Sequence, residues 1–237
     1  MPKLFALRWF KENIGYDFNE ISEYSKMPFL TRLCLYGKFN SFDEFKAIFL
    51  CAIELGASAN PDTVKGISPL GIICASPNDK DFIQKFDFIL QHTDRNGLNC
   101  FFENPLCNLL KQPLDPTTTL AVKKLLARSD VIVDRYGSGE EFDNTREFGT
   151  PMHYAVRNLD VTAIKLLLDR SPKDVVSPFS FDRRHNMTTV FGLITKLIEA
   201  NKQNIAENPS PSLLETKQIL EQIRELLQKK MQPADEN

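Results

Sequence analysis

Three histidines and five cysteines are the residues of this chain best suited to nucleophilic or metal chemistry. Zinc sites usually place two ligands a few residues apart, and no C-x-x-C pair or comparable Cys/His spacing exists here. A nucleophilic thiol needs a histidine close to it in the fold, so a pairing of Cys74 or Cys107 with a distant histidine stays open, although no local signature supports it. We therefore expect no metal site and no cofactor. The full set is His92, His153, His185, Cys34, Cys51, Cys74, Cys100 and Cys107.

The remaining catalytic patterns are also missing from the sequence. It contains no G-x-x-x-x-G-K-[ST] or G-x-G-x-x-G phosphate loop, no H-E-x-x-H and no G-x-S-x-G. Glu140 and Glu141 are adjacent carboxylates, but they lie in a glycine-flanked loop where solvent would screen the interactions that shift a catalytic pKa. We expect that the chain is not an enzyme.

Composition indicates an ordinary folded protein. The 237 residues are 42% hydrophobic and 25% charged, with a net charge of −2 and a pI near 6.0, so a nucleic-acid partner is not expected. The 18 phenylalanines are expected to fill gaps between helices. No apolar run reaches the length of a membrane span. The N-terminus lacks a secretory h-region, and the odd cysteine count fits a reducing intracellular compartment.

The elements that would position these residues are revealed by a recurring opening. Residues 149–168 read GTPMHYAVRNLDVTAIKLLL. Thr150 can cap a helix that begins at Pro151, because proline is well tolerated in the first turn. Ala155 allows close helix packing, and an apolar face from Ile164 to Leu168 predicts a second helix.

Four weaker copies of this opening occur elsewhere. They begin near Phe29, Gly66, Asn104 and Asn186, and each precedes a second apolar segment. Prolines 28, 69, 105 and 151 anchor them at steps of 41, 36 and 46 residues. One such unit cannot bury its own apolar face, so the pattern predicts a stack.

The T-P-M-H-Y-A stretch resembles the T-P-L-H-x-A signature of the ankyrin repeat, with Met152 in place of leucine. The repeat period is about 33 residues, so every step here carries an insertion. The resemblance implies an all-α solenoid of about five helix-turn-helix units with short finger loops, capped at both ends by extra helices. The expected divisions are an N-terminal cap at 1–26, an array at 27–209 with units near 27–61, 65–98, 100–134, 148–180 and 186–209, and a C-terminal capping helix and tail at 210–237.

The ends and insertions carry their own expectations. Residues 1–26 are too apolar for a disordered tail, which fits a terminal cap. Ser212 to Glu215 reads as a capping box before a helix with an apolar stripe; a partner helix or coiled coil is the alternative. We expect a polar linker at 201–210. The 135–147 insertion falls where the repeat forms its β-hairpin finger.

In the ankyrin family, the concave face of the first helices and the finger loops bind proteins. The resemblance therefore implies a monomeric protein-binding module, with no nucleic acid and no membrane span. Alternatives are an enzyme with a small active site in the insertions, or a scaffold subunit of a larger assembly. The implied partner-binding residues are Arg32, Tyr36, Asn108, Lys111, Tyr154, Arg157 and Asn158 on the concave face, with Tyr136, Phe142 and Arg183 on the fingers.

The irregularity of the repeats adds a hypothesis about origin. They are rich in Phe, Asn, Ile and Lys, and they resemble the divergent ankyrin repeats of effector proteins from intracellular bacteria. Some such effectors carry a glutamate-rich C-terminal signal, and Glu221, Glu225, Asp235 and Glu236 occupy a comparable region. The resemblance implies a secreted bacterial effector that acts on a host protein in the host cytoplasm.

Overall fold

The computed structural model describes residues 2–21, 27–60, 66–135, 137–138, 148–170, 179–181 and 187–231. Most of these residues are helical, as the sequence predicts, and the strands are only two or three residues long. The chain divides into two compact modules, Met1–Pro105 and Leu106–Asn237. No helix in the described part of the chain is long and apolar enough to cross a bilayer.

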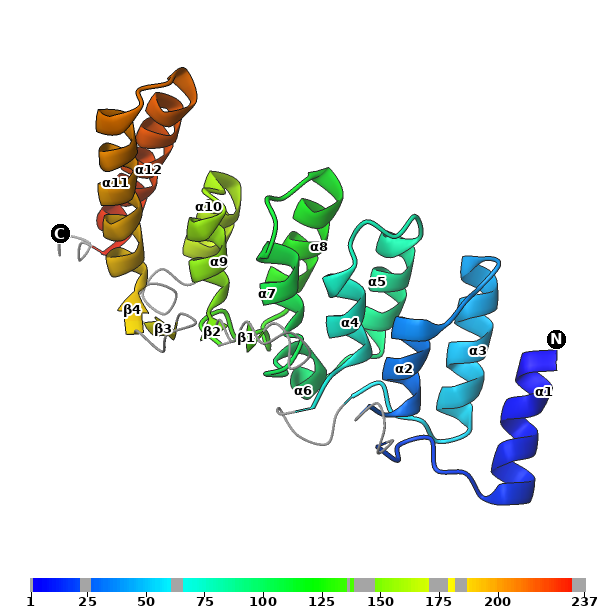
Figure 1. Cartoon of the computed structure of the whole chain (residues 1–237). Coiled ribbons are helices and arrows are strands. Elements are labelled where there is room, and N and C mark those ends of the chain that lie inside the picture. Colours follow the sequence, from blue (N-terminus) through cyan, green and yellow to red (C-terminus); the bar gives the residue numbers. More distant parts are fainter. Residues whose placement is uncertain are drawn as a thin grey trace. The chain divides into compact units, whose positions relative to one another are not determined.

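The N-terminal module consists of helices that pack in consecutive pairs (Figure 1). Helix α2 contacts α3 and α4, α4 contacts α5, and α3 contacts α5, so each pair packs on the next. Helix α1 packs against α3, the position expected of a terminal cap. The elements are α1 (Pro2–Trp9), the π-helix η1 (Phe10–Ile14), α2 (Phe29–Tyr36), α3 (Phe42–Glu54), α4 (Pro69–Ala75), α5 (Phe82–Gln91) and α6 (Arg95–Leu98).

The C-terminal module repeats the same arrangement. Helix α9 contacts α10 and α11, α10 contacts α8 and α12, and α11 and α12 lie side by side (Figure 1). Helix α7 begins at the last residue of the N-terminal module. The helices are α7 (Pro105–Leu110), α8 (Pro116–Leu126), α9 (Pro151–Arg157), α10 (Val161–Arg170), α11 (Val190–Glu207) and α12 (Pro211–Met231).

Four short strands form one antiparallel sheet in the C-terminal module. They are β1 (Gly137–Ser138), β2 (Phe148–Gly149), β3 (Phe179–Phe181) and β4 (Met187–Thr189), paired in that order. Gly137 pairs with Gly149, Phe148 with Phe181, and Phe181 with Met187. The 135–147 insertion therefore contains β1, which pairs with β2 directly after the insertion, at the place where the sequence predicts a finger.

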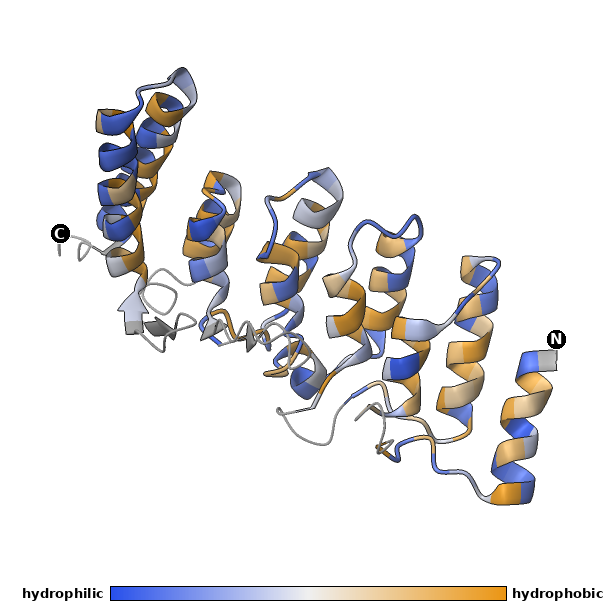
Figure 2. Ribbon diagram, in the orientation of Figure 1, coloured by the Kyte–Doolittle hydropathy of each residue, from blue (hydrophilic) through white to orange (hydrophobic). Residues whose placement is uncertain are grey.

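Phenylalanine rings fill the spaces between consecutive pairs, as the composition predicts. Phe45 and Phe49 of α3 lie 6.2 and 5.3 Å from Phe88 of α5, between ring centroids. Figure 2 shows that α4 is largely hydrophobic, whereas α12 has a mixture of hydrophobic and hydrophilic residues. In α12 the apolar stripe is real, because Leu220, Ile223 and Leu227 are buried.

Capping residues define where the helices begin. Ser68 accepts a hydrogen bond from the Gly71 N–H at 3.0 Å, Asp115 accepts from Thr118 at 2.7 Å, and Thr189 accepts from Gly192 at 3.0 Å. Each hydroxyl or carboxylate satisfies a backbone donor that the first helical turn leaves free. The motif Ser/Thr/Asp–Pro in the sequence thus marks real helix starts.

One contact recurs in all four steps from one pair to the next. The first helices of the pairs are α2, α4, α7, α9 and α11. The third residue of one first helix lies against a backbone carbonyl, which belongs to the residue two positions before the first helix of the next pair. Thr31 Oγ1 donates to Ile67 at 3.1 Å, Cys107 Sγ to Gly149 at 3.8 Å, and His153 Nε2 lies 3.3 Å from the Thr188 oxygen. Gly71 fills the fourth place, and there a Cβ would collide with the carbonyl oxygen of Glu103. The helix pairs are therefore structural repeats in a shared register.

Asparagine amides form a second repeated link in the N-terminal module. Asn19 donates to the Gly56 carbonyl at 2.7 Å and accepts from the Ser58 N–H at 2.7 Å. Asn60 donates to the His92 carbonyl at 3.1 Å and accepts from the Asp94 N–H at 2.8 Å. In both cases one amide bridges two backbone groups that are two residues apart on the following segment.

Three local expectations were wrong. Pro28 does not match the other anchoring prolines: α2 begins at Phe29, so Pro28 occupies the capping position instead. The expected linker at 201–210 is helical up to Glu207, since α11 extends from Val190 to Glu207. Helix α12 begins at Pro211 rather than after Ser212, and the Ser210 hydroxyl accepts from the Leu213 N–H at 3.4 Å.

Candidate functional site

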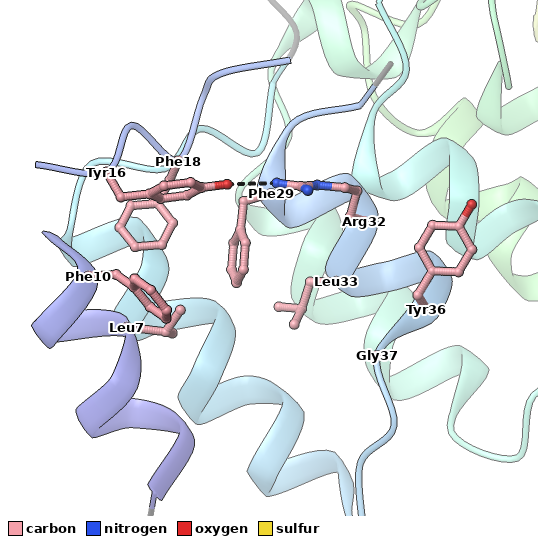
Figure 3. A pocket seen from close by; sticks show the side chains of 9 residues that line it. All are labelled: Leu7, Phe10, Tyr16, Phe18, Phe29, Arg32, Leu33, Tyr36 and Gly37. Atoms are coloured by element: carbon pink, nitrogen blue, oxygen red, sulfur yellow. Dashed lines mark hydrogen bonds between the residues drawn. The ribbon is translucent and has the colours of Figure 1, made fainter. Parts of the chain in front are cut away.

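The N-terminal module contains an apolar groove of about 550 Å³. It lies between the α1–η1 segment and α2 (Figure 3). Phe29 and Leu33 extend from α2 toward Phe10 and Leu7, while Tyr36 stands at the end of α2. The lining residues are Leu7, Phe10, Tyr16, Phe18, Phe29, Arg32, Leu33, Tyr36 and Gly37.

The groove is shaped by a turn that directs the chain back over α2. Gly15 ends η1 with φ of 68°, a left-handed conformation that glycine adopts without a steric penalty. The Tyr16 N–H then donates to the Phe10 carbonyl at 3.2 Å, and the Phe29 N–H donates to the Phe18 carbonyl at 3.1 Å. These backbone bonds hold the returning segment against α2.

Aromatic rings form a continuous wall along this segment. Ring centroids are 6.4 Å apart for Phe10 and Tyr16, 5.1 Å for Tyr16 and Phe18, and 5.2 Å for Phe18 and Phe29. The last two pairs are edge-to-face, the arrangement that the aromatic quadrupole favours.

Arg32 is the one charged side chain among the described residues that line the groove. The guanidinium Nη2 donates to the Tyr16 hydroxyl at 2.8 Å (Figure 3). The Nε atom is buried and has no hydrogen-bond partner among the described residues. Among the residues that the structure describes, no carboxylate forms an ion pair with Arg32, so this half-buried cation is bonded only to a neutral group.

The rim of the groove leaves apolar surface open to solvent. Tyr36 is 65% exposed, Phe10 is 45% exposed, and Trp9 packs edge-on against Phe10 with centroids 5.5 Å apart. Exposed aromatic side chains that are clustered rather than scattered are typical of interaction sites. The rim therefore extends the contact surface beyond the groove itself.

The structure brings Arg32 and Tyr36 together in this groove, and it corrects the expectation for three residues of the C-terminal module. Asn108 is 4% exposed and Tyr154 is 8% exposed, so neither offers much surface to a partner. The Asn158 amide donates to the Leu110 carbonyl at 2.8 Å and thereby links two helix pairs. The family position predicts exposure, but close packing between consecutive pairs covers these side chains.

The other two concave residues of that module are half-buried. The Arg157 guanidinium lies 5.9 Å from the centroid of the Tyr154 ring. Arg157 also lines a smaller pocket of about 240 Å³ beside α11 and α12. Lys111 follows α7 and is half-buried. Tyr136, Phe142 and Arg183, the predicted finger residues, lie outside the described residues.

Sequence reasoning missed the aromatic wall. Phe10, Tyr16 and Phe18 were expected only to cap the stack, because their spacing matches no helix or strand period. The available signal was the glycine at position 15 between two aromatic clusters, which indicates that the segment turns back on itself. The ring contacts depend on that turn.

The cysteines and histidines do not form a reactive cluster in the described part of the chain. Burial raises the pKa of the Cys74 and Cys100 thiols, so both stay protonated and weakly nucleophilic at neutral pH. The Cys107 thiol is buried and donates to the carbonyls of Arg135 and Gly149. No group of three or more His, Cys, Asp or Glu side chains there is arranged to bind a metal.

His153 is buried in a structural role. Its Nδ1 lies 2.8 Å from the Thr150 hydroxyl and accepts from the Thr150 N–H at 3.4 Å, which leaves Nε2 to donate to Thr188. This pattern requires the neutral ring with its proton on Nε2. Burial, assisted by the positive charge of Arg157, lowers the pKa of His153 from 6.5 to about 4, despite the bond to the Thr188 carbonyl.

No protein-family model matches the chain, and no curated protein matches it significantly.

Proposed function

We propose that this chain is a divergent ankyrin-repeat protein without enzymatic activity, whose function is to bind another protein. The recurring contact between the third residue of one first helix and the carbonyl ahead of the next carries the repeat part of this proposal. His153 makes that contact from the histidine position of the T-P-L-H-like motif, and Thr31, Gly71 and Cys107 occupy the same place in the other repeats.

The groove carries the binding part of the proposal. Four of its lining residues, Phe29, Arg32, Leu33 and Tyr36, belong to α2, the first helix of a pair, where the ankyrin resemblance implies a partner surface. An open apolar wall with a tyrosine and an arginine at its edge has the residue types that most often anchor protein interfaces. Repeat arrays offer extended surfaces of this kind, which suit macromolecules better than small ligands.

The proposal is tested by affinity capture from eukaryotic cell lysate with the full-length chain as bait. The variant bait carries Arg32→Gln and Tyr36→Ala, and a matched control carries Arg8→Gln, an exposed α1 arginine that does not line the groove. We expect one protein to bind the wild type and the control and to be lost from the variant. Purified components should then bind directly.

The captures also separate the alternatives. A partner held equally by all three baits would keep the binding function but place it elsewhere, for example on Lys111 and Arg157. Failure to recover any protein that binds directly would contradict the proposed function. A role inside a host cell is a separate hypothesis, and a translocation reporter fused to the full chain tests it: no delivery from an intracellular bacterium would contradict it.

A further inference from the structure

We propose that the groove of the N-terminal module binds an internal segment of a partner protein in which a large apolar side chain stands next to an aspartate or glutamate. This inference rests on the proposed protein-binding function and specifies the chemistry of the partner. Two independent features of the groove lead to it: the aromatic wall and the charge of Arg32, which forms no ion pair with a described residue.

The aromatic wall favours binding of a large apolar side chain of the partner. A volume of about 550 Å³ falls in the range of roughly 300 to 1,000 Å³ that is typical of ligand pockets. The apolar residues that line it are Leu7, Phe10, Phe18, Phe29 and Leu33. A large aliphatic or aromatic side chain placed there would remove apolar area on both partners from water, which is the main favourable term in association.

The charge selects a carboxylate beside that anchor. A half-buried cation without a counter-charge is costly, because burial removes water and no anion replaces it. Among the described residues, the Arg32 guanidinium bonds only to the neutral Tyr16 hydroxyl, and its Nε–H has no acceptor there. The Tyr16 oxygen accepts that bond, so its own hydrogen stays available to the same ligand. Charge-assisted bonds from a guanidinium to a carboxylate are the strong ones.

The surrounding charges favour a protein segment over an anionic membrane. Arg8 and Lys11 are exposed on the N-terminal segment, but Glu12, Asp17 and Glu20 are exposed there too. A lipid surface attracts clusters of several basic residues, whereas the described residues here mix both signs around one arginine in an apolar site. The groove is open to solvent rather than enclosed, so a side chain of a bound segment can enter it from outside.

The test is a selection of random dodecapeptides displayed on phage against the full-length chain. Selected sequences are then made as synthetic peptides with acetylated and amidated ends, so that only side-chain carboxylates carry negative charge. Binding is measured by fluorescence anisotropy to the wild type, to Arg32→Gln and to the control Arg8→Gln. Equal thermal unfolding midpoints establish that the variants are folded.

We expect the selected peptides to share a large apolar residue adjacent to Asp or Glu. Arg32→Gln should raise Kd at least about tenfold, and replacing the peptide carboxylate by its amide should do the same. The two changes together should cost no more than either alone, because they remove one interaction. Arg8→Gln should change Kd less than about twofold, since exposed charges contribute little.

Several results would overturn the proposal. The first is a selection that yields no peptide, or only peptides without an acidic residue. The second is an equal loss of peptide affinity in Arg32→Gln and Arg8→Gln. The third is a concentration-dependent dimer that Arg32→Gln abolishes, because it would assign the groove to a second copy of the chain. If these results appeared while the lysate capture still yielded a direct partner, the protein-binding function would stand on a different surface.

Discussion

Protonation of His153 should weaken the fold at mildly acidic pH. The buried neutral ring links α9 to Thr188, two residues before α11, and its pKa is lowered from 6.5 to about 4. The unfolded chain therefore binds a proton near pH 6.5, whereas the folded chain resists protonation until about pH 4. Because the unfolded state gains protons first, the free energy of unfolding decreases as the pH falls through this window.

The size of the effect follows from the two pKa values. The full difference between 6.5 and about 4 corresponds to about 3 kcal/mol at 1.36 kcal/mol per pKa unit. About 1.4 kcal/mol of this is lost by pH 5.5 and about 2.5 kcal/mol by pH 4.5. A loss of that size is a large part of the stability of a typical domain.

The assay compares urea unfolding of the wild type and of His153→Gln, followed by circular dichroism at pH 7.5, 6.5, 5.5 and 4.5. Glutamine can keep a donor and an acceptor but cannot titrate in this range. The other histidines and the carboxylates titrate in both proteins, so the difference between the two pH profiles isolates His153. We expect the wild type to lose about 2.5 kcal/mol more than the variant between pH 7.5 and 4.5.

Parallel pH profiles would refute this reasoning, because they would mean that His153 binds its proton equally in the folded and unfolded states. An independent check is the imidazole proton shift of His153 in the NMR spectrum of the folded protein. The shift should stay constant from pH 7.5 to 5. A midpoint near 6.5 would show that the ring is accessible to protons in the native state.

Three further predictions concern the contacts that define the repeats. Gly71→Ala should destabilise the chain by roughly 1–3 kcal/mol, because the new methyl meets the Glu103 backbone. The control Gly192→Ala changes the third residue of α11 and should be neutral or mildly stabilising, because the nearest atom there is the rotatable Thr188 hydroxyl. Equal unfolding midpoints of the two variants in chemical denaturation would contradict this prediction. Asn60→Ala should lower the free energy of unfolding by about 1–3 kcal/mol, because the His92 carbonyl and the Asp94 N–H lose their bonds to the Asn60 amide. The control Asn40→Ala should cost little, because the Asn40 amide donates to the nearby Glu44 carboxylate within the same segment. Hydrogen exchange at the Asp94 amide should accelerate only in Asn60→Ala. Asp115→Ala should cost about 1 kcal/mol through loss of the α8 cap, and Asp115→Asn should retain most of it. The bond from the Thr118 N–H lowers the pKa of Asp115 below 3.8, so this contribution should persist above that pH and disappear on further acidification; a wild type that loses it at pH 6 would contradict the assignment.

The helix pairs were predictable from sequence because their starts depend on local chemistry. A serine, threonine or aspartate before proline fixes both a cap and the first helical turn, and it marks α4, α8 and α9 at the observed residues. The Thr150–His153 motif likewise predicts the buried histidine. These signals need no knowledge of distant residues.

The groove was only partly predictable because it depends on contacts between distant residues. Arg32 and Tyr36 were found through the repeat alignment, but Tyr16 reaches Arg32 only because Gly15 turns the chain back. The predicted exposure of Asn108 and Tyr154 was wrong, because packing between consecutive helix pairs buries both side chains. Residue type and spacing do not record that packing.

The central claim is that the chain binds a partner protein through the groove of its N-terminal module. The most direct test is hydrogen–deuterium exchange of the full-length chain with and without the protein recovered by affinity capture. We predict slower exchange in the backbone of α2 and of the segment around Tyr16 and Phe18, and loss of that protection in Arg32→Gln at the same concentrations. Protection confined to α9–α12, or unchanged exchange in α2 at saturating partner, would contradict the account.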